Sequence, residues 1–387
     1  MKLLRIVRSM SPSSGGISTG IREMHQSLKD HGCIVKIVCL DDPNSPWSND
    51  LDGDLICLGP VNNKYGYSKG LSNKICMIAR DFDVAIIEGI WSYHSFACWR
   101  AFRRIDLPYF VYTHGMLDPW FKNNFPLKHL KKWIFWPWSD YRVLRDSVNV
   151  LFTTEQERLL ARESFWLYKA NECVTGYGIS PPPDDIESQR DKFLTQFPYL
   201  RGKRIVLFLS RIHPKKGLDL LIDAFASIAN SDQNLCLVIA GPDQIGFQSQ
   251  LELKVQLAGI THQVHWLGMI TGDLKWGAFR SAELFCLPSH QENFGVVVAE
   301  ALACRVPVAI SNPVNLSTDV LLSNAGIVHD DTSIGTKDAL RRWLKMSSSQ
   351  IETMVDNGFN LYSSRFKISA VVNNLISILH STFSEDA

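Results

Sequence analysis

The chain has 387 residues, of which 45% are hydrophobic and 20% are charged, and its formal net charge is +1 at pH 7. This length exceeds what a single hydrophobic core organises, so two or three domains are expected, and the composition is that of a globular protein. The near-zero net charge gives no reason to expect a nucleic-acid partner, and no apolar run approaches the roughly 20 residues of a membrane-spanning helix.

The cysteines and the first residues both indicate a cytoplasmic protein. Nine cysteines are scattered along the chain without a Cys-x2-Cys pair, and several lie in strand-like apolar runs. This pattern predicts reduced thiols in the core and argues against structural zinc. Charges interrupt the short apolar run at residues 2–7, which therefore predicts a first strand and not a signal peptide.

The first half of the chain alternates between two kinds of segment. Strand-like apolar runs occur at residues 3–7, 34–40, 54–58, 84–88, 109–113, 148–153 and 172–176. Helix-like segments such as 17–30, 71–80 and 96–104 separate most of them. Strands alternating with helices predict a doubly wound parallel sheet, whose ligands gather at the carboxyl ends of the strands.

Two loops at predicted strand ends contain residues suited to a ligand. Gly15 and Gly16 follow the first strand and open a helix, but their spacing fits neither the dinucleotide fingerprint nor a P-loop. A tight turn and a phosphate contact both fit this pattern. His114 and Gly115 follow the strand at 109–113, although a lone histidine in a loop often has no special role.

Two Asp-x-Asp matches, at residues 52–54 and 81–83, raise the question of a divalent metal. Both precede predicted strands, whereas a metal-binding Asp-x-Asp follows one. We therefore interpret them as polar loops and predict no metal site.

Residues 120–138 have an unusual composition, in which aromatic residues alternate with lysines. Lys128, Lys131 and Lys132 lie among Trp133, Trp136 and other aromatics. Such a segment suits a membrane surface, with rings at the depth of the headgroups and ammonium groups against anionic lipid. The alternative is that the rings pack inside the domain and the lysines face solvent.

Three consecutive prolines at 181–183 and a polar stretch as far as residue 201 interrupt the alternation and predict a linker over 179–201. A second alternating series follows, with strand-like runs at 204–210, 236–240, 264–267, 284–287 and 306–310. A second α/β domain is expected over 202–365. Helix-like segments lie at 351–365 and 369–383.

Arg211 and Lys216 follow the strand at 205–209, five residues apart and just before a helix. Arg grips a phosphate with two parallel hydrogen bonds and Lys supplies a point charge, so the pair suits a diphosphate. Met269 follows the strand at 264–267, and we expect the backbone there to lie near a nucleotide base.

Residues 287–303 combine a strand end, a polar loop and a helix start. The amides of Phe294, Gly295 and Val296 would open the helix and face an anion. Glu292 and Glu300 flank them, and each carboxylate could accept hydrogen bonds from two neighbouring hydroxyls of a sugar or ribose. Taken alone, such a pair is more often an exposed loop and helix charge.

The segments 288–289, 292–295 and 300–303 together resemble the Glu-x7-Glu signature of retaining glycosyltransferases of family four, which have the GT-B fold. The resemblance implies two doubly wound Rossmann-like domains facing across a cleft. It implies that Glu292 contacts the donor sugar and Glu300 the ribose of a nucleotide-sugar.

The resemblance also assigns roles to other residues of the chain. It implies that Arg211 and Lys216 clamp the diphosphate, that His114 lies beside the donor sugar, and that the Gly16 backbone approaches the phosphates. The donor-binding residues implied are Gly16, Asn293, Phe294, Gly295, Val296, Glu300 and Met269. Relatives often have a histidine where this chain has Glu88, so we expect Glu88 to face the acceptor instead.

These patterns and the resemblance together predict a retaining, metal-independent hexosyltransferase that uses a nucleoside-diphosphate-sugar and needs no cofactor. Residues 1–178 would bind a glycan or lipid-linked acceptor, 202–365 would bind the donor, and 366–387 would form a helix packing back on the first domain. We expect a cytoplasmic location, peripheral on the membrane through 120–138, and a part in bacterial surface polysaccharide or lipopolysaccharide synthesis. Two alternatives stay open: a GT-B-fold epimerase or phosphorylase, and a non-catalytic nucleotide-sugar-binding scaffold.

Overall fold

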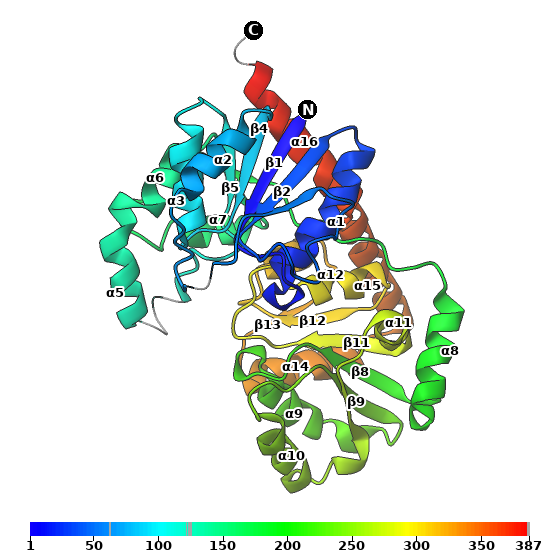
Figure 1. The fold of residues 1–387 in the computed structure, drawn as a ribbon. Helices are drawn as coiled ribbons and strands as arrows, with labels where there is room; N and C mark the ends of the chain where they lie inside the picture. The colour runs from blue at the N-terminus through cyan, green and yellow to red at the C-terminus, as the bar shows by residue number, and fades with distance from the viewer. Residues whose placement is uncertain (62, 121, 123–125, 385–387) are drawn as a thin grey trace. The chain divides into compact units, whose positions relative to one another are not determined.

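The computed structural model describes the chain except residues 62, 121, 123–125 and 385–387. The chain divides into two compact units. The first comprises Met1–Gly178 together with Ile368–Ala387, and the second comprises Ile179–Lys367. Each unit is a parallel sheet with helices on both of its faces (Figure 1). The α/β fold class expected from the alternating segments is therefore confirmed.

The first unit has a seven-stranded sheet with the strand order β3-β2-β1-β4-β5-β6-β7, and every pairing is parallel. The strands are β1 (Lys2–Val7), β2 (Ile34–Cys39), β3 (Leu55–Cys57), β4 (Val84–Glu88), β5 (Tyr109–Tyr112), β6 (Val150–Phe152) and β7 (Glu172–Val174). Its helices are α1 (Gly16–Asp30), α2 (Leu71–Ala79), α3 (Tyr93–Phe102), α5 (Pro126–Phe135), α6 (Asp140–Arg145), α7 (Glu155–Ala161) and α16 (Ile368–Ser384).

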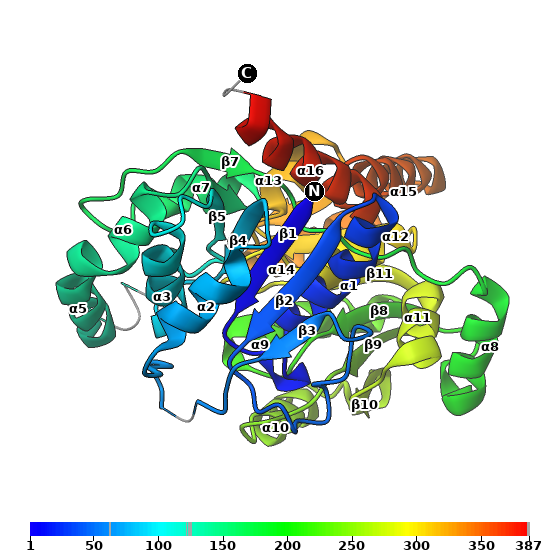
Figure 2. The ribbon, with the colours of Figure 1, turned by 45° about the horizontal axis from the view of Figure 1, so that its top comes forward.

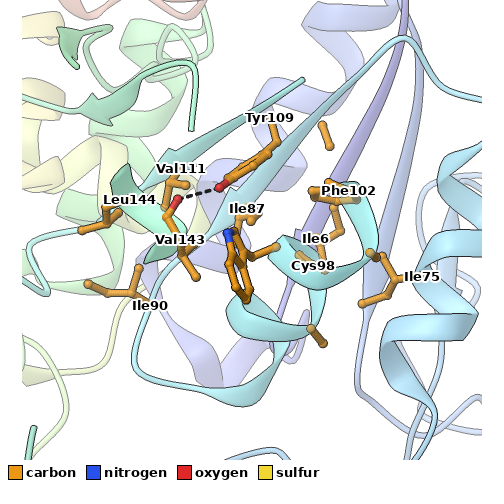
Figure 3. Close-up of a cluster of buried hydrophobic side chains, with 14 of the residues drawn as sticks. Ile6, Ile75, Ile87, Ile90, Cys98, Phe102, Tyr109, Val111, Val143 and Leu144 are labelled. Carbon is orange, nitrogen blue, oxygen red and sulfur yellow. Dashed lines mark hydrogen bonds between the residues drawn. The ribbon is translucent and has the colours of Figure 1, made fainter. Parts of the chain in front are cut away.

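The two faces of this sheet carry separate hydrophobic clusters. On one face, Ile6, Ile87 and Val111 pack against helices α2, α3 and α6, and the Tyr109 hydroxyl donates to the Val143 carbonyl at 2.8 Å (Figure 3). On the other face, strand residues such as Leu3 pack against α1 and α16. Because both faces are buried, the strands are continuously apolar instead of alternating with polar residues.

Helix α16 joins the sheet of the first unit although it is the last helix in the chain (Figure 2). Val371, Val372, Leu375 and Leu379 are all buried in the cluster on that face of the sheet. The chain therefore leaves the first unit at Gly178 and returns to it at Ile368.

The second unit has a six-stranded parallel sheet with the order β10-β9-β8-β11-β12-β13. The strands are β8 (Arg204–Leu209), β9 (Leu235–Ala240), β10 (Val264–Gly268), β11 (Ala282–Leu287), β12 (Val308–Ser311) and β13 (Gly326–His329). The helices are α8 (Ile186–Gln196), α9 (Leu218–Ala226), α10 (Gln248–Leu257), α11 (Gly272–Ser281), α12 (Val296–Ala303), α13 (Ser317–Leu322), α14 (Ser333–Leu344) and α15 (Ser348–Leu361).

The prediction of a linker over 179–201 was wrong for its central part, because α8 packs against α11 within the second unit. Phe193 is fully buried there, and Gly277 of α11 lets the two helices approach closely. The polar composition that suggested a linker belongs to the exposed side of α8, whose apolar contacts are few.

No helix among the described residues combines the length and the apolarity that a bilayer span requires.

The contact between α8 and α11 can be tested by substituting Gly277 with Ala. A Cβ at this position would lie 2.2 Å from the Gln189 carbonyl oxygen and 2.6 Å from the Phe193 Cβ, so the helices must separate. We expect the free energy of unfolding to fall by about 1–3 kcal/mol in urea titrations. Gly16→Ala is the control, since nothing lies within 4 Å of its added Cβ; equal stability of the two variants would contradict this packing.

Candidate active site

The candidate residues of the second unit follow two neighbouring strands, β8 and β11. The strand order reverses between these two, because β9 continues from β8 on one side while β11 and β12 continue on the other. Ligands of open α/β sheets bind at such a switch point, beyond the carboxyl ends of the strands. Arg211 and Lys216 follow β8, and Glu292 follows β11.

Hydrogen bonds hold the two loops after β8 and β11 against each other. The Ser289 hydroxyl donates to the Lys215 carbonyl at 3.0 Å, and the His290 amide donates to the same carbonyl at 2.9 Å. Gly217 has a φ of 65°, and a Cβ there would lie 1.9 Å from the Pro288 carbonyl oxygen. Only glycine permits this approach, which brings the basic and acidic residues together.

Lys216 and Glu292 form an ion pair between these loops. Lys216 is 8% exposed, so its ammonium is fixed in place instead of moving freely in solvent. The Glu292 amide donates to the Pro313 carbonyl at 3.2 Å, and the Asn315 amide donates to the Glu292 carbonyl at 3.0 Å. The structure therefore places both predicted residues in one rigid cluster.

Arg211 lies beside this cluster with an exposed side chain and forms no ion pair with any described residue. The pKa of His213 is lowered by its partial burial and then by the charges of Arg211, Lys215 and Lys216. These three basic residues give a positive potential at the carboxyl end of β8. Such a potential favours an anion such as a diphosphate.

The helix start after Glu292 has the geometry that an anion site needs. Gly295 is the N-cap of α12 with a φ of 82°, a left-handed conformation that favours glycine. Asn293 and Val296 flank it, and the first amides of the helix have no partner within the helix. The Phe294 ring is buried and meets the Phe366 ring edge-on at 5.4 Å, so only the Phe294 backbone can serve a ligand.

Glu300 lies on α12 with 8% of its surface exposed. Its Oε1 accepts from the Lys275 Nζ of α11 at 2.7 Å. Burial raises the pKa of Glu300, and the charge of Lys275 opposes that rise. The sequence analysis missed Lys275, because no motif distinguishes it from the other exposed positions of an amphipathic helix.

Met269 is 70% exposed after β10, and no described contact joins it to the ion pairs. The Gly241 amide donates to the Gly268 carbonyl at 2.7 Å, which links the loops after β9 and β10. The structure thus gives Met269 an accessible backbone but no connection to the acidic residues.

In the first unit, Gly16 opens α1 after β1, and Gly15 is the N-cap with a φ of 72°. The Tyr177 hydroxyl donates to the Gly16 carbonyl at 2.5 Å. Gly20 makes room for this contact, since a Cβ there would lie 2.1 Å from the Tyr177 hydroxyl. Sequence reasoning missed Tyr177, which is separated from Gly16 by 161 positions.

His114 belongs to a chain of buried charges that crosses the other switch point, between β1 and β4. The Arg5 Nε donates to the Glu88 Oε1 at 2.8 Å, and the Glu88 Oε2 lies 2.7 Å from the His114 Nε2. Burial alone would raise the pKa of Glu88, but Arg5 and His114 hold it below its ordinary value.

The expectation that Glu88 faces the acceptor is wrong. Its side chain has no exposed surface, and both carboxylate oxygens are engaged. A buried carboxylate needs partners, and this one has the Arg5 guanidinium on Oε1 and the His114 ring nitrogen on Oε2. Glu88 therefore lies between Arg5 and the His114 ring, in contact with both.

A second carboxylate holds the backbone on both sides of His114, which has a φ of 49°. The Glu157 Oε1 accepts from the Thr113 hydroxyl at 2.8 Å and from the Gly115 amide at 2.6 Å. The pattern from Thr154 to Glu157 is typical of a capping box, so the sequence predicts that the Glu157 carboxylate bonds to the first turn of its own helix. Only the fold shows that it also supports the histidine loop.

The second aspartate of each Asp-x-Asp match is engaged in other contacts. Asp54 pairs with His25, Lys29 and Lys36 at 3.0, 2.7 and 2.9 Å, and Asp83 accepts from the Lys2 amide at 2.6 Å. Over the described ranges, no three His, Cys, Asp or Glu residues are grouped as a metal site would require.

Comparison with known families matches both units. The profile described as "Glycosyl transferase 4-like domain" matches residues 15–178, and the profile described as "Glycosyl transferases group 1" matches residues 189–360. Together the two profiles span most of the first unit and most of the second.

A curated relative with a similar sequence is the D-inositol 3-phosphate glycosyltransferase of Salinispora tropica, 30% identical over 190 residues. The matched stretch covers 47% of this chain and 39% of that relative, so the chain spans less than half the relative's length.

Solved structures share the fold over almost the whole chain. Sucrose-phosphate synthase from Thermosynechococcus elongatus has a TM-score of 0.77 at 18% identity, covering 100% of both chains. Anabaena HepE in complex with UDP-glucose has a TM-score of 0.74 at 17% identity, covering 98% of this chain and 100% of that one. The expected pair of Rossmann-like domains is confirmed.

The ion pairs around Glu88 can be tested by the substitution Glu88→Gln. Removing the buried charge leaves Arg5 without compensation, so we expect a loss of about 3–5 kcal/mol in the free energy of unfolding at pH 7. Because the folded-state pKa of Glu88 is lowered, its stabilisation is present above the ordinary pKa of 4.5 and disappears as the pH falls. The difference between wild type and variant should therefore shrink in acid.

The control for this measurement is Glu283→Gln. Glu283 is 44% exposed and pairs with Arg204 on the surface, so its loss should cost under about 1 kcal/mol. A similar, small cost for both substitutions would show that the buried pairs do not stabilise the first unit.

Proposed function

Because the chain belongs to the glycosyl transferases group 1 family, we propose that it is a retaining, metal-independent hexosyltransferase. It moves a sugar from a nucleoside-diphosphate-sugar to a glycan or lipid-linked acceptor. The observation that carries this proposal is the joined pair of loops in the second unit, where Lys216 and Glu292 form an ion pair beside exposed Arg211 and the start of α12.

Each residue of this group has a separate task in the proposed reaction. Arg211 and Lys216 stabilise the negative charge that develops on the departing diphosphate, together with the amides that open α12. Glu292 accepts hydrogen bonds from the donor sugar, and Glu300 accepts them from the ribose. Lys216 pairs with Glu292, so Glu292 and a bound diphosphate would attract the same ammonium.

The transfer itself follows the front-side course of retaining enzymes. The acceptor hydroxyl oxygen forms a bond to the anomeric carbon on the face from which the diphosphate leaves. The bond between that carbon and the phosphate oxygen breaks, and the leaving phosphate takes the proton of the hydroxyl. This course needs no protein nucleophile, and excluding water from the site limits hydrolysis of the donor.

In the first unit, we assign His114 to the donor sugar and the backbone at Gly16 to the diphosphate. Glu88 and Glu157 hold the His114 ring and its loop, and Tyr177 holds the Gly16 carbonyl. These supports keep both groups in fixed geometries, which a positioning role requires. We place the acceptor among bacterial surface polysaccharides and lipopolysaccharides, in line with the family resemblance.

Helix α5 supports peripheral attachment to the cytoplasmic face of a membrane. None of its residues is buried. Its large exposed apolar side chains are Leu127, Leu130, Trp133, Ile134 and Phe135, followed by Trp138. Lys128 and Lys131 lie among them, and phosphate-bearing lipids would attract their charges.

Not every residue of the segment 120–138 fits this surface. The Lys132 Nζ lies 4.4 Å from the centre of the Trp91 ring, and burial lowers the pKa of Lys132, so this lysine is held by the protein. Trp136 is fully buried in the core of the first unit. Phe121 and Phe125 lie outside the described residues.

The donor site can be tested by thermal unfolding with UDP, GDP, ADP and dTDP, each with and without EDTA. A nucleotide at about 100 times its dissociation constant should stabilise the protein by roughly 2.7 kcal/mol, and EDTA should not change this. Glu300→Ala should remove most of the shift, whereas the exposed Glu252→Ala should retain it. Absence of a shift with every nucleotide would refute the proposed donor site.

The membrane surface can be tested with the double variant Lys128→Ala and Lys131→Ala in sedimentation with anionic liposomes. Each lysine near an anionic surface contributes about 1 kcal/mol, so the partition coefficient should fall roughly 30-fold. Lys337→Ala with Lys345→Ala removes the same charge from α14 and should leave binding unchanged. Equal binding of the two double variants would contradict attachment through α5.

A further inference from the structure

Lys275 and Glu300 form an ion pair in the second unit, and none of the sequence motifs described above assigns a role to Lys275. Lys275 lies on α11 and Glu300 on α12, and their charged atoms are 2.7 Å apart. The side chains are 24% and 10% exposed, so the pair is partly shielded from water. The Lys275 ammonium also lies 4.2 Å from the centre of the Trp276 ring, which limits its movement.

We propose that Lys275 is a positioning and specificity residue of the nucleotide site, which keeps the Glu300 carboxylate ionised and oriented toward the 2′- and 3′-hydroxyls of the donor ribose. The inference rests on the proposed function, because it deepens the role given there to Glu300. The inference adds Lys275 to the nucleotide site, and recognition of the ribose then depends on the positive charge of Lys275.

The argument starts from the hydrogen-bonding capacity of the carboxylate. An ionised carboxylate has about four lone-pair positions on two oxygens, and Lys275 uses one of them on Oε1. The remaining positions can accept from two neighbouring hydroxyls at once. A protonated carboxyl loses part of this capacity and carries no charge to strengthen the bonds.

Burial works against the ionised form of Glu300. The pKa of Glu300 is raised by burial, and Lys275 is the charge that opposes this rise. Removing Lys275 would therefore raise the pKa of Glu300 further, so the carboxyl would take up its proton at a higher pH than in the wild type. Nucleotide binding would then weaken as the pH falls through that higher pKa.

Other titratable groups on the elements around α12 are neutral or already paired among the described residues. Cys304, one turn beyond Glu300, has its pKa raised to about 12 and stays a neutral thiol. Arg280 of α11 donates hydrogen bonds to Gln189 and to the Pro183 carbonyl. The other charged groups near α12 form ion pairs with residues other than Glu300. These pairs are Asp356 with Arg305, Arg365 with Asp319, and Lys216 with Glu292. Lys275 is thus the charge that controls this carboxylate.

A purely structural pair between α11 and α12 would give a different result. Loss of a purely structural pair would lower the stability of the unit. It would also weaken the binding of every nucleotide by the same factor at every pH. A role in ribose recognition instead weakens the ribonucleotide more than its 2′-deoxy form, which keeps only the 3′-hydroxyl, and the effect is strongest when Glu300 is protonated. The test therefore compares two sugars and two pH values.

The experiment measures dissociation constants by isothermal titration calorimetry for UDP, GDP and ADP and for their 2′-deoxy forms, at pH 6.5 and 8.5. The proteins are the wild type, Lys275→Met, Lys275→Arg and the control Lys254→Met. Lys254 forms a surface pair with Asp223 at 2.7 Å on another helix of the same unit. Circular dichroism and thermal unfolding of each variant establish that it is folded.

We expect the wild type to prefer the ribonucleotide over its deoxy form by about tenfold, as one charge-assisted hydrogen bond would give. Lys275→Met should lose most of this preference at pH 6.5 and bind the ribonucleotide about tenfold more weakly, and the defect should shrink at pH 8.5. Lys275→Arg should restore the preference, and Lys254→Met should match the wild type.

Three outcomes would overturn the inference. The first is an equal loss for ribo and deoxy forms at both pH values, which indicates a structural pair. The second is unchanged binding in Lys275→Met, and the third is tighter binding, which would mean that the lysine blocks the carboxylate. Failure of the wild type to bind any nucleotide is a separate result, because it refutes the proposed function itself.

Discussion

The positions of the candidate residues follow from one constraint, which is that all strands of a parallel sheet end at the same edge. Where the strand order reverses, the loops of two neighbouring strands diverge and leave room between them. The second unit reverses between β8 and β11, and the first between β1 and β4. Arg211, Lys216 and Glu292 lie at one reversal, and Gly16 and the Glu88–His114 pair lie at the other.

A second regularity concerns charge. Three carboxylates near these loops have a cationic partner within their own unit: Glu292 has Lys216, Glu300 has Lys275 and Glu88 has Arg5. An unpaired carboxylate at such depth would take up a proton instead of remaining charged. Each ion pair also holds its carboxylate side chain in one orientation.

Much of the fold was readable from the sequence because the strands are short, apolar and separated by amphipathic helices. The strand β13 was not predicted, since Gly326–His329 is only four residues long and contains a glycine and a histidine. The helix α8 was mistaken for linker because its apolar contacts come from few residues, chiefly Phe193. Composition alone does not distinguish a helix with a largely polar surface from an extended connection.

The candidate site was predicted less completely than the fold. Glycines and charged residues at strand ends can be read from local spacing, as for Gly16, Arg211 and Glu292. Lys275, Tyr177 and Glu157 have no local signature, because each acts on a residue that is distant in sequence. Their partners are set by helix packing and strand order, which a linear pattern does not encode.

The return of the chain to its first unit has a consequence for biosynthesis. One face of the first sheet is completed by Val371, Val372, Leu375 and Leu379, which the ribosome adds only after the whole second unit. The apolar side chains on that face, such as Leu3 and Phe110, therefore stay uncovered by α16 until the whole second unit has been synthesised. The second unit can thus complete its folding before the first unit does. This order is the reverse of the one usual for nascent chains, in which the N-terminal domain folds first.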